Sequence, residues 1–381
     1  MNTLNHKLTT DNSSTNEIAY LIGVSTKKLS SINKEESSIA ELKTLVESAG
    51  AQVIGIDIQK REFPHPKSFI GSGKLETISE IIKLNKVNVL VVNSEISGSQ
   101  QMFIEKKLGI KVIDRSSVIL DIFANRAKSK EALLQVSLAQ HEYLLPRLRG
   151  QWTHLERFSG GIGNRGPGET QLETDRRLVA EKISLLKKKI KKIYKHRELI
   201  RNKRKKNLVP DVGIIGYTNA GKSSLMTALS KRKPSIANRP FETLDTTIGK
   251  IWVKDNIFFT VTDTVGFYSN LPIELVSAFK ATIEEIANSD LLIHVIDSSS
   301  PNIINQLDSV YMTINDLNLL NIPMISIFNK IDCVNEMENF DNIKALIMRN
   351  FKNNIDILNV SCKTKSGIDD LKKSIIFELF S

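Results

Sequence analysis

A run of eight residues in the second half of the chain has the spacing of a phosphate-binding loop, G-x-x-x-x-G-K-S. It follows an apolar run, and a helix-like run over 224–229 comes directly after it. Its two glycines let successive backbone N–H groups face a phosphate, and the helix N-terminus adds partial positive charge. Lys222 would bridge the β- and γ-phosphates, and the Ser223 hydroxyl would bind Mg²⁺. The expected nucleotide contacts are Gly216, Tyr217, Thr218, Asn219, Ala220, Gly221, Lys222 and Ser223.

The motif Asp263-Thr264-Val265-Gly266 follows a strand-like run. An aspartate in this position holds Mg²⁺ through a water molecule, and the N–H group of Gly266 would contact the γ-phosphate. The pattern D-x-x-G alone is common by chance. The phosphate-binding loop that precedes it makes a functional interpretation of this motif more probable than chance.

The motif Asn329-Lys330-Ile331-Asp332 indicates which base is bound. The Asp332 carboxylate can accept hydrogen bonds from guanine N1–H and N2–H₂, a pair of donors that adenine lacks, so ATP would leave it poorly satisfied. The predicted nucleotide is therefore GTP or GDP. A loop after the last strand-like run, Ser361-Cys362-Lys363, is expected to support the guanine O6 atom.

The segment Phe241-Glu242-Thr243-Leu244-Asp245 is the expected switch region and completes the predicted nucleotide contacts. Thr243 lies twenty residues after Ser223 and twenty before Asp263, which is similar to the spacing in Ras-like GTPases. Thr247 is the alternative, because Asp-Thr-Thr resembles the Asp-Pro-Thr of small GTPases. These threonines could also serve only a neighbouring strand.

Hydrolysis requires a positioned water molecule, for which Ras-like enzymes use a glutamine directly after the D-x-x-G glycine. Phe267 occupies that position, so intrinsic turnover is expected to be slow and to depend on a partner. Asn219 matches the loop position that helps to bind K⁺ in potassium-activated GTPases such as the MnmE family. Lys222, Gly266 and Asn219 are thus the expected catalytic residues, with Mg²⁺ and possible K⁺ as cofactors.

Alternating strand-like and helix-like runs predict an α/β fold with two sheets, both mainly parallel. In the first part, strands are expected at 19–24, 52–58, 87–92 and 111–113, with helices at 38–47, 75–84 and 100–108. In the last part, six strands are expected at 212–215, 251–253, 258–262, 291–296, 324–328 and 357–360, which matches a P-loop GTPase domain.

Between the two α/β parts, helical spacing predicts an antiparallel coiled-coil hairpin. Its first helix is expected over 130–145 with Leu134, Leu138 and Leu145, and its second helix from about residue 173. Glycines and a proline in 159–168 predict an exposed tip loop. The predicted seam of the second helix is Val179, Ile183, Leu186, Ile190, Ile193 and Ile200, with Arg197 as its polar interruption. The expected domains are a disordered tail at 1–16, an α/β domain at 17–127, the hairpin at 128–207 and a GTPase domain at 208–381.

The charge of the chain is concentrated in the hairpin. The chain carries 53 Lys plus Arg against 42 Asp plus Glu, a net charge of +11, and residues 181–207 alone hold 13 basic and 2 acidic residues. The rest is close to neutral, which indicates a polyanionic partner for this segment. Apolar runs such as 291–296 are far shorter than the ~20 residues that span a bilayer. We therefore expect a soluble cytoplasmic monomer without integral membrane association, with Cys333 and Cys362 as reduced thiols.

The chain resembles the HflX family of ribosome-associated GTPases, a group of translation-factor-related P-loop GTPases. The resemblance rests on the signature G-I-G-N-R-G-P-G-E-T-Q-L-E-T-D-R-R over 161–177 and on Q-W-T-H-L-E over 151–156. The segments 216–223, 241–245 and 263–267 also match the family pattern. The likeness extends from about residue 17 to the end.

This resemblance implies binding to the 50S ribosomal subunit and its rRNA, GTP hydrolysis stimulated by the ribosome, and splitting or rescue of stalled or idle ribosomes. Arg165, Arg176 and Arg177 could contact RNA phosphates near the tip of the hairpin, although a run of lysines could also only solvate one face of a coiled coil. Two departures limit the transfer. Thr246 replaces the usual proline of the switch segment, and the chain stops at Ser381, where many members continue into a further domain.

Three other interpretations stay open at this point. The protein could be a GTP-gated assembly or stress factor that binds RNA on the 50S subunit without splitting ribosomes. It could regulate a membrane protease complex, which the lack of a spanning or amphipathic anchor disfavours. The short run Gly71-Ser72-Gly73-Lys74 lacks phosphate-loop spacing, so it predicts a loop before a helix, and a second nucleotide site in the first domain is disfavoured.

Overall fold

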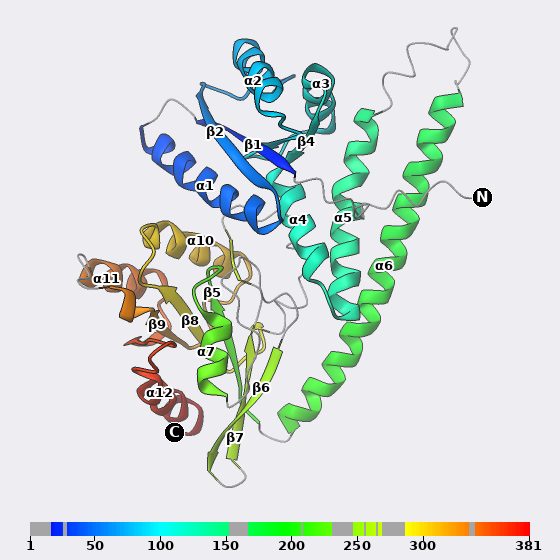
Figure 1. The fold of residues 1–381 in the computed structure, drawn as a ribbon. Coiled ribbons are helices and arrows are strands. Elements are labelled where there is room, and N and C mark those ends of the chain that lie inside the picture. The colour runs from blue at the N-terminus through cyan, green and yellow to red at the C-terminus, as the bar shows by residue number, and fades with distance from the viewer. Residues whose placement is uncertain are drawn as a thin grey trace. The chain divides into compact units, whose positions relative to one another are not determined.

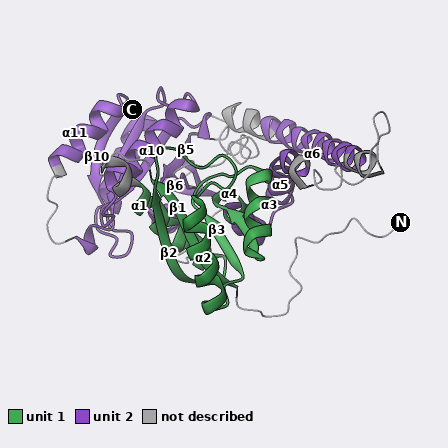
Figure 2. Ribbon diagram, turned by 90° about the horizontal axis from the view of Figure 1, so that it is seen from above, with its two compact units in different colours: residues 1–118 green, residues 119–381 purple. Residues whose placement is uncertain are grey.

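The computed structural model describes residues 17–25, 29–151, 167–206, 209–230, 247–254, 257–263, 266–268, 286–334 and 340–381 (Figure 1). The chain divides into two compact units, residues 1–118 and 119–381 (Figure 2). Each described unit contains one sheet. The switch segment 241–245, Thr264, Val265 and Arg165 lie outside the described residues.

The first unit is built on a parallel four-stranded sheet in the order β2-β1-β3-β4. The central strands are almost fully buried, which matches their continuous apolar sequences. Its strands are β1 (Ile18–Ser25), β2 (Gln52–Lys60), β3 (Val89–Val92) and β4 (Lys111–Asp114), and its helices are α1 (Leu29–Ser48), α2 (Ser72–Asn85) and α3 (Gly98–Leu108). The expected small α/β domain with a parallel sheet is confirmed.

A fourth helix, α4 (Arg115–Arg126), follows β4 without a loop and was missed by the sequence analysis. The Asp114 carboxylate starts it by accepting a hydrogen bond from the Ser117 N–H group at 2.9 Å. Val118, Ile122 and Phe123 are buried on its apolar face. The polar run Asp114-Arg115-Ser116-Ser117 at this boundary, with its N-cap aspartate, was the signal that could have revealed the helix.

The run Gly71-Ser72-Gly73-Lys74 was predicted to be a loop before a helix, but only Gly71 precedes α2, and Ser72, Gly73 and Lys74 form its first turn. Lys74 forms an ion pair with Asp57 of β2 at 2.6 Å, and the Tyr20 hydroxyl donates a hydrogen bond to the same carboxylate oxygen at 2.7 Å. The lysine therefore joins a helix to the sheet within the first unit.

The second unit begins with an antiparallel pair of helices, α5 (Lys130–Gln151) and α6 (Pro167–Lys206). Ion pairs of 2.7 Å join Glu142 to Lys187 and Glu131 to Arg197. The earlier residue of α5 pairs with the later residue of α6, so the two helices are antiparallel. The seam residues Ile183, Leu186 and Ile190 are buried against α5. Arg197, the polar interruption of the seam, is thus matched by an acidic residue on the facing helix.

Both helices are longer than the sequence pattern indicates. α5 continues through Pro146 to Gln151, and α6 begins at Pro167, within the stretch expected to form the tip loop. Proline is favoured in the first turn of a helix because its missing N–H group has no partner there. The prediction that 159–168 contains no helix was therefore wrong for its last two residues, while 152–166 lie outside the described residues.

The rest of the second unit is a six-stranded sheet in the order β10-β9-β8-β5-β7-β6, in which β6 alone is antiparallel among the described strands. The fold class predicted for this part is confirmed. The strands are β5 (Asp211–Gly216), β6 (Thr247–Lys254), β7 (Ile257–Asp263), β8 (Leu291–Asp297), β9 (Met324–Asn329) and β10 (Asn354–Asn359). The described helices are α7 (Lys222–Leu229), α10 (Ile303–Asp316), the 3₁₀ turn η1 (Ile331–Cys333), α11 (Phe340–Asn350) and α12 (Ile368–Phe380).

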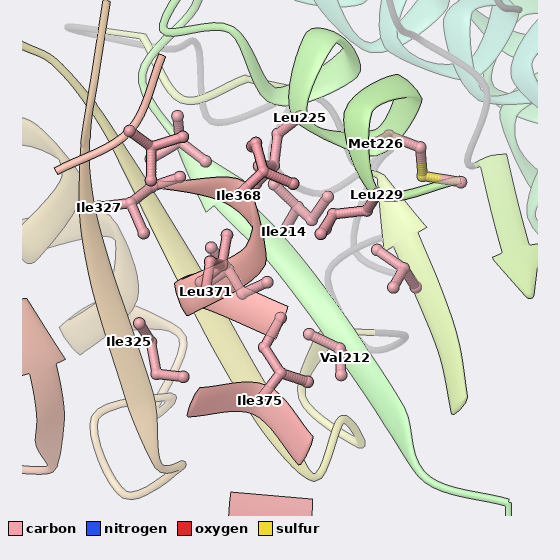
Figure 3. Packing of buried hydrophobic residues seen from close by; sticks show 14 of the residues in the cluster. Val212, Ile214, Leu225, Met226, Leu229, Ile325, Ile327, Ile368, Leu371 and Ile375 are labelled. Carbon is pink, nitrogen blue, oxygen red and sulfur yellow. The ribbon is translucent and has the colours of Figure 1, made fainter. Parts of the chain in front are cut away.

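The core of this sheet lies where α7 and α12 pack on one of its faces (Figure 3). Leu225 and Leu229 of α7 and Leu371 and Ile375 of α12 meet the buried side chains of the strands, among them Val212, Ile214, Ile325 and Ile327. This packing fixes the start of α7, and with it the loop that precedes the helix.

A buried histidine in this sheet makes stability depend on pH. His294 of β8 is fully enclosed beside the Phe351 ring, and burial, with a smaller contribution from the Lys222 charge, lowers its pKa to about 3. The unfolded chain takes up a proton near pH 6.5 while the folded chain does not. The folded state is therefore favoured above pH 6.5 and loses stability as the pH falls toward 3.

We expect the free energy of unfolding to fall by up to about 1.4 kcal/mol per pH unit below pH 6.5 because of this histidine alone. Urea unfolding at pH 7.5 and 5.5 measures the difference. His294→Leu, which does not titrate, should lose most of that slope, whereas His196→Gln on the exposed face of α6 should keep it. An unchanged slope in His294→Leu would assign the acid sensitivity to other groups.

Candidate nucleotide-binding site

The loop 216–223 connects the end of β5 to the start of α7. Gly216 and Gly221 have φ values of 148° and 97°, and Asn219 has a φ of 61°. A Cβ atom on Gly216 would collide with the Val295 carbonyl, and one on Gly221 with the Asn329 side chain. Both glycines are therefore required by positive φ and by close neighbours, as the loop motif predicts.

Lys222 lies in the first turn of α7 and is buried, with its ammonium group donating a hydrogen bond to the Tyr217 carbonyl at 2.7 Å. Burial lowers its pKa to about 8, and the nearby Asp263 carboxylate opposes that shift. The ammonium group thus lies within the loop itself, where phosphate oxygens would replace the carbonyl as its partner.

The Ser223 hydroxyl donates a hydrogen bond to the Asp263 carboxylate at 2.8 Å, which joins the loop to the end of β7. A hydroxyl oxygen beside a carboxylate is a donor set that suits Mg²⁺, which keeps several waters and is bound by few protein groups together with phosphates. No group of three or more His, Cys, Asp or Glu side chains in the described part of the chain could hold a metal. These two residues fit a nucleotide-bound Mg²⁺ ion, with the phosphates completing its shell.

Gly266 and Phe267 are held against the loop by backbone hydrogen bonds. The Thr218 N–H group donates to the Phe267 carbonyl at 2.8 Å, and the Phe267 N–H group donates to the Gly216 carbonyl at 3.0 Å. A Cβ atom on Gly266 would lie 2.9 Å from the Thr218 Cα atom and 2.7 Å from the Lys222 ammonium group, so a larger residue would have to displace the loop backbone. The Phe267 side chain is buried and has no polar atom to orient a water molecule.

The guanine-recognition motif follows β9. Asn329 is buried and bridges two loops: its side-chain amide donates to the Ala220 carbonyl at 2.8 Å, and its side-chain oxygen accepts from the Cys362 N–H group at 3.2 Å. Lys330, with a φ of 63°, forms an ion pair with Asp297 at 2.6 Å. Sequence reasoning did not identify Asp297, and its place at the end of an apolar strand was the available signal.

Asp332 projects from η1 with an exposed carboxylate. One of its oxygens accepts a hydrogen bond from the Ser361 hydroxyl at 2.6 Å, and this bond is the main reason that the pKa of the carboxyl is lowered. The Thr364 N–H group in turn donates to the Ser361 hydroxyl at 3.1 Å. The Cys333 thiol donates to the other oxygen at 3.7 Å, and Ser361 therefore orients an ionised carboxylate at the exposed surface.

Asn329→Ala tests the bridge between the loops. The change leaves the buried Ala220 carbonyl without this donor, so we expect a loss of roughly 1–3 kcal/mol in the free energy of unfolding and faster release of GDP. Release of a fluorescent GDP analogue and thermal unfolding measure the two effects. The exposed Asn353→Ala serves as the control, since the Asn353 side-chain amide also donates a hydrogen bond to a backbone carbonyl, that of Asn321 at 2.9 Å, but at the surface. Equal release rates in both variants would show that the bridge does not hold the nucleotide.

A pocket of about 1000 Å³ opens beside these loops. One end is lined by Asn329, Asp332, Cys362 and Lys363, which were predicted to surround the base, and by Gly221 of the phosphate-binding loop. The other end extends along α7 to β6 and α12. Burial raises the pKa of the Cys362 thiol to about 12, so this cysteine stays protonated at the wall of the pocket.

Of the remaining predicted residues, Thr247 lies beside this cluster, two arginines lie on α6, and others are outside the described residues. Thr247 is the first residue of β6 and pairs with Asp263 across the strands. Arg176 and Arg177 lie on α6, where Arg177 is exposed and 3.8 Å from Glu181. Thr243 belongs to the switch segment outside the described residues. Among the described helices, none is both long enough and apolar enough to cross a membrane.

The sheet order, the phosphate-binding loop after β5, and the D-x-x-G and N-K-x-D motifs after β7 and β9 together define a P-loop GTPase domain. Comparisons with known proteins agree. Family models described as the GTP-binding GTPase N-terminal, the GTP-binding GTPase middle region and the 50S ribosome-binding GTPase match residues 36–124, 126–204 and 211–330.

GTPase HflX of Caldanaerobacter subterraneus subsp. tengcongensis is 43% identical over 91% of this chain and 78% of its own length. GTPase HflX of Flavobacterium psychrophilum is 45% identical over 83% of this chain and 76% of its own. A crystal structure of SsGBP with GDP has 26% identity and a TM-score of 0.50, covering 94% of this chain and 97% of that one. The chain belongs to the HflX family of GTPases.

Proposed function

We propose that this GTPase acts on the large ribosomal subunit, hydrolyses GTP faster when bound there, and separates or rescues stalled or idle ribosomes. The observation that carries the proposal is the match of residues 211–330 to a family model described as 50S ribosome-binding GTPase. The charge on α6 supports it: Lys188, Lys189, Lys191 and Lys192 are exposed, whereas Lys187 pairs with Glu142. Exposed lysines in one stripe suit RNA phosphates.

In this proposal Ser223 and, through water, Asp263 hold Mg²⁺, with Thr243 or the alternative Thr247 completing the switch contact. The ion would neutralise charge that develops on the transferring phosphate. Lys222 binds the β- and γ-phosphates, the Gly266 N–H group contacts the γ-phosphate, and Asp332 selects guanine. Arg165, Arg176 and Arg177 contact RNA near the hairpin tip.

The buried Phe267 side chain supports slow turnover in the isolated protein, because a water-orienting group must come from elsewhere. We propose that K⁺ bound beside Asn219 accelerates hydrolysis in place of a water-orienting side chain. If so, hydrolysis is faster in K⁺ than in Na⁺, and Asn219→Ala removes the difference. Equal rates in the two salts would exclude this role.

The deciding experiment measures GTP hydrolysis with and without purified 50S subunits, with Lys222→Ala as the blank. Strong stimulation supports a ribosome-activated GTPase, and its absence overturns that part of the proposal. Light scattering of intact ribosomes under single-turnover conditions then tests separation. If 50S subunits stimulate hydrolysis but the ribosomes do not separate, the protein is a GTP-gated docking factor. In that case, GTP hydrolysis serves only to release the protein from the subunit.

A further inference from the structure

A group of aromatic and basic side chains lies on one face of the β6–β7 hairpin, and two of them, Lys250 and Trp252, line the end of the pocket that is farther from the guanine-recognition residues. β6 is the edge strand of the six-stranded sheet and pairs only with β7 among the described strands (Figure 1). Its residues alternate, so that Ile251 is buried in the core while Lys250, Trp252 and Lys254 are exposed. Phe258 lies directly opposite Trp252 in the register.

These side chains contact one another across the two strands. The Trp252 and Phe258 rings have centroids 5.0 Å apart and are tilted by 49°, and the Lys250 ammonium group lies 4.9 Å from the centroid of Phe258. Trp252 nevertheless remains 62% exposed. The arrangement presents a large aromatic surface with a lysine two residues away on each side of it.

Protection of an edge strand explains the lysines but not the tryptophan. Lysines on edge strands discourage pairing with other chains. An exposed tryptophan works against that purpose, because large exposed apolar groups favour association. The two features are explained together by a ligand that requires an aromatic surface and positive charge at once.

We propose that the face formed by Lys250, Trp252, Lys254 and Phe258, here the β6–β7 face, binds RNA by stacking an unpaired base on Trp252 and holding the neighbouring phosphates with the two lysines. Aromatic platforms flanked by basic residues bind single-stranded nucleic acid in this manner. A protein partner fits less well, because lysine is depleted at the centres of protein interfaces. In the described parts of β6 and β7 the one carboxylate is Asp263, which is buried at the far end of β7.

Trp252 is distant from the phosphate and Mg²⁺ end of the nucleotide site, although it lines the same pocket as the guanine-recognition residues. Trp252 lies five residues along β6 from Thr247, the partner of Asp263, a distance of about 17 Å at the rise of a strand. In taking ribosomal RNA as the natural partner, the inference rests on the function proposed above. RNA binding by this face can be tested without the ribosome.

The test uses the full chain with GDP and a fluorescein-labelled ten-nucleotide oligouridylate, followed by anisotropy. Trp252→Ala should weaken binding by roughly 5- to 150-fold, since a stacked base contributes about that much. Trp252→Phe should lose less, and Phe377→Ala, which removes an exposed ring from α12, should bind within twofold of the unaltered chain. Lys250→Gln with Lys254→Gln should reduce the slope of log affinity against log salt by about 1.4, while Lys352→Gln should not change it.

A second readout reports on stacking directly. The chain has two tryptophans, so Trp152→Phe leaves Trp252 as the sole indole. Its fluorescence should be quenched as oligouridylate saturates the protein. Absence of binding, absence of quenching, or unchanged affinity in Trp252→Ala would each overturn the proposal.

Binding to purified 50S subunits separates this inference from the function that it rests on. If Trp252→Ala binds oligouridylate normally but binds the subunit less well, the face contacts protein and the RNA proposal is wrong. If the unaltered chain binds oligouridylate through Trp252 but does not bind the subunit, the RNA surface stands and the ribosomal function fails.

Discussion

Lys222→Ala is expected to reduce kcat/KM for GTP by about 10²–10³-fold, the usual effect of removing one charged donor from a phosphate in a transition state. In the structure this ammonium group is buried inside the loop and bonded to the Tyr217 carbonyl at 2.7 Å. Its pKa of about 8 shows that burial disfavours the charged form before phosphate arrives. Phosphate oxygens would supply the missing negative charge and restore a firmly protonated lysine.

The same burial predicts that the variant is not unfolded. An ammonium group in a buried position costs stability, so alanine should leave the melting temperature of the nucleotide-free protein unchanged or raise it. Steady-state hydrolysis and thermal unfolding are measured together, with Lys352→Ala as an exposed control. A melting temperature that falls sharply in Lys222→Ala would mean that lost activity reflects misfolding. Activity close to that of the control would remove Lys222 from the phosphate site.

Asp332→Asn is expected to lower the affinity for GTP by about 10²-fold or more, because an amide in place of the carboxylate can accept only one of the two hydrogen bonds that guanine offers. Xanthine carries a carbonyl where guanine carries its 2-amino group, so the new amide donor suits it. The variant should therefore bind XTP more tightly than GTP.

The hydrogen bond from Ser361 can be kept when asparagine replaces Asp332. The Ser361 hydroxyl donates to one side-chain oxygen at 2.6 Å, and asparagine keeps an oxygen that can accept this bond. Asp308→Asn, an exposed carboxylate on α10, controls for the change of charge. Competition of GTP, GDP, XTP and ATP against a fluorescent nucleotide measures the preference. A variant that keeps its preference for GTP over XTP would show that the base is read by other groups.

Several features of this protein are determined by its sequence alone. The phosphate-binding loop, D-x-x-G and N-K-x-D are contiguous runs whose residue types are dictated by local geometry, such as the positive φ of Gly221. The seam of α6 is likewise local, because a helical period repeats within one element, and Ile183, Leu186 and Ile190 are buried as that period predicts. The parallel sheets also follow from the alternation of strand and helix.

Only the tertiary structure determined how these pieces meet. Asn329 bonds to Ala220 across 109 residues of chain. Arg115 bonds to Ser38, Glu41 and Asn93 from a helix that the sequence analysis missed. The burial of Phe267 and the exposure of Trp252 were also determined by the tertiary structure, since residue type alone does not distinguish a buried aromatic ring from an exposed one. Local patterns specify backbone conformation and the buried face of an element, whereas the partner of a polar group and the side of a sheet that stays open are set by packing between segments distant in sequence.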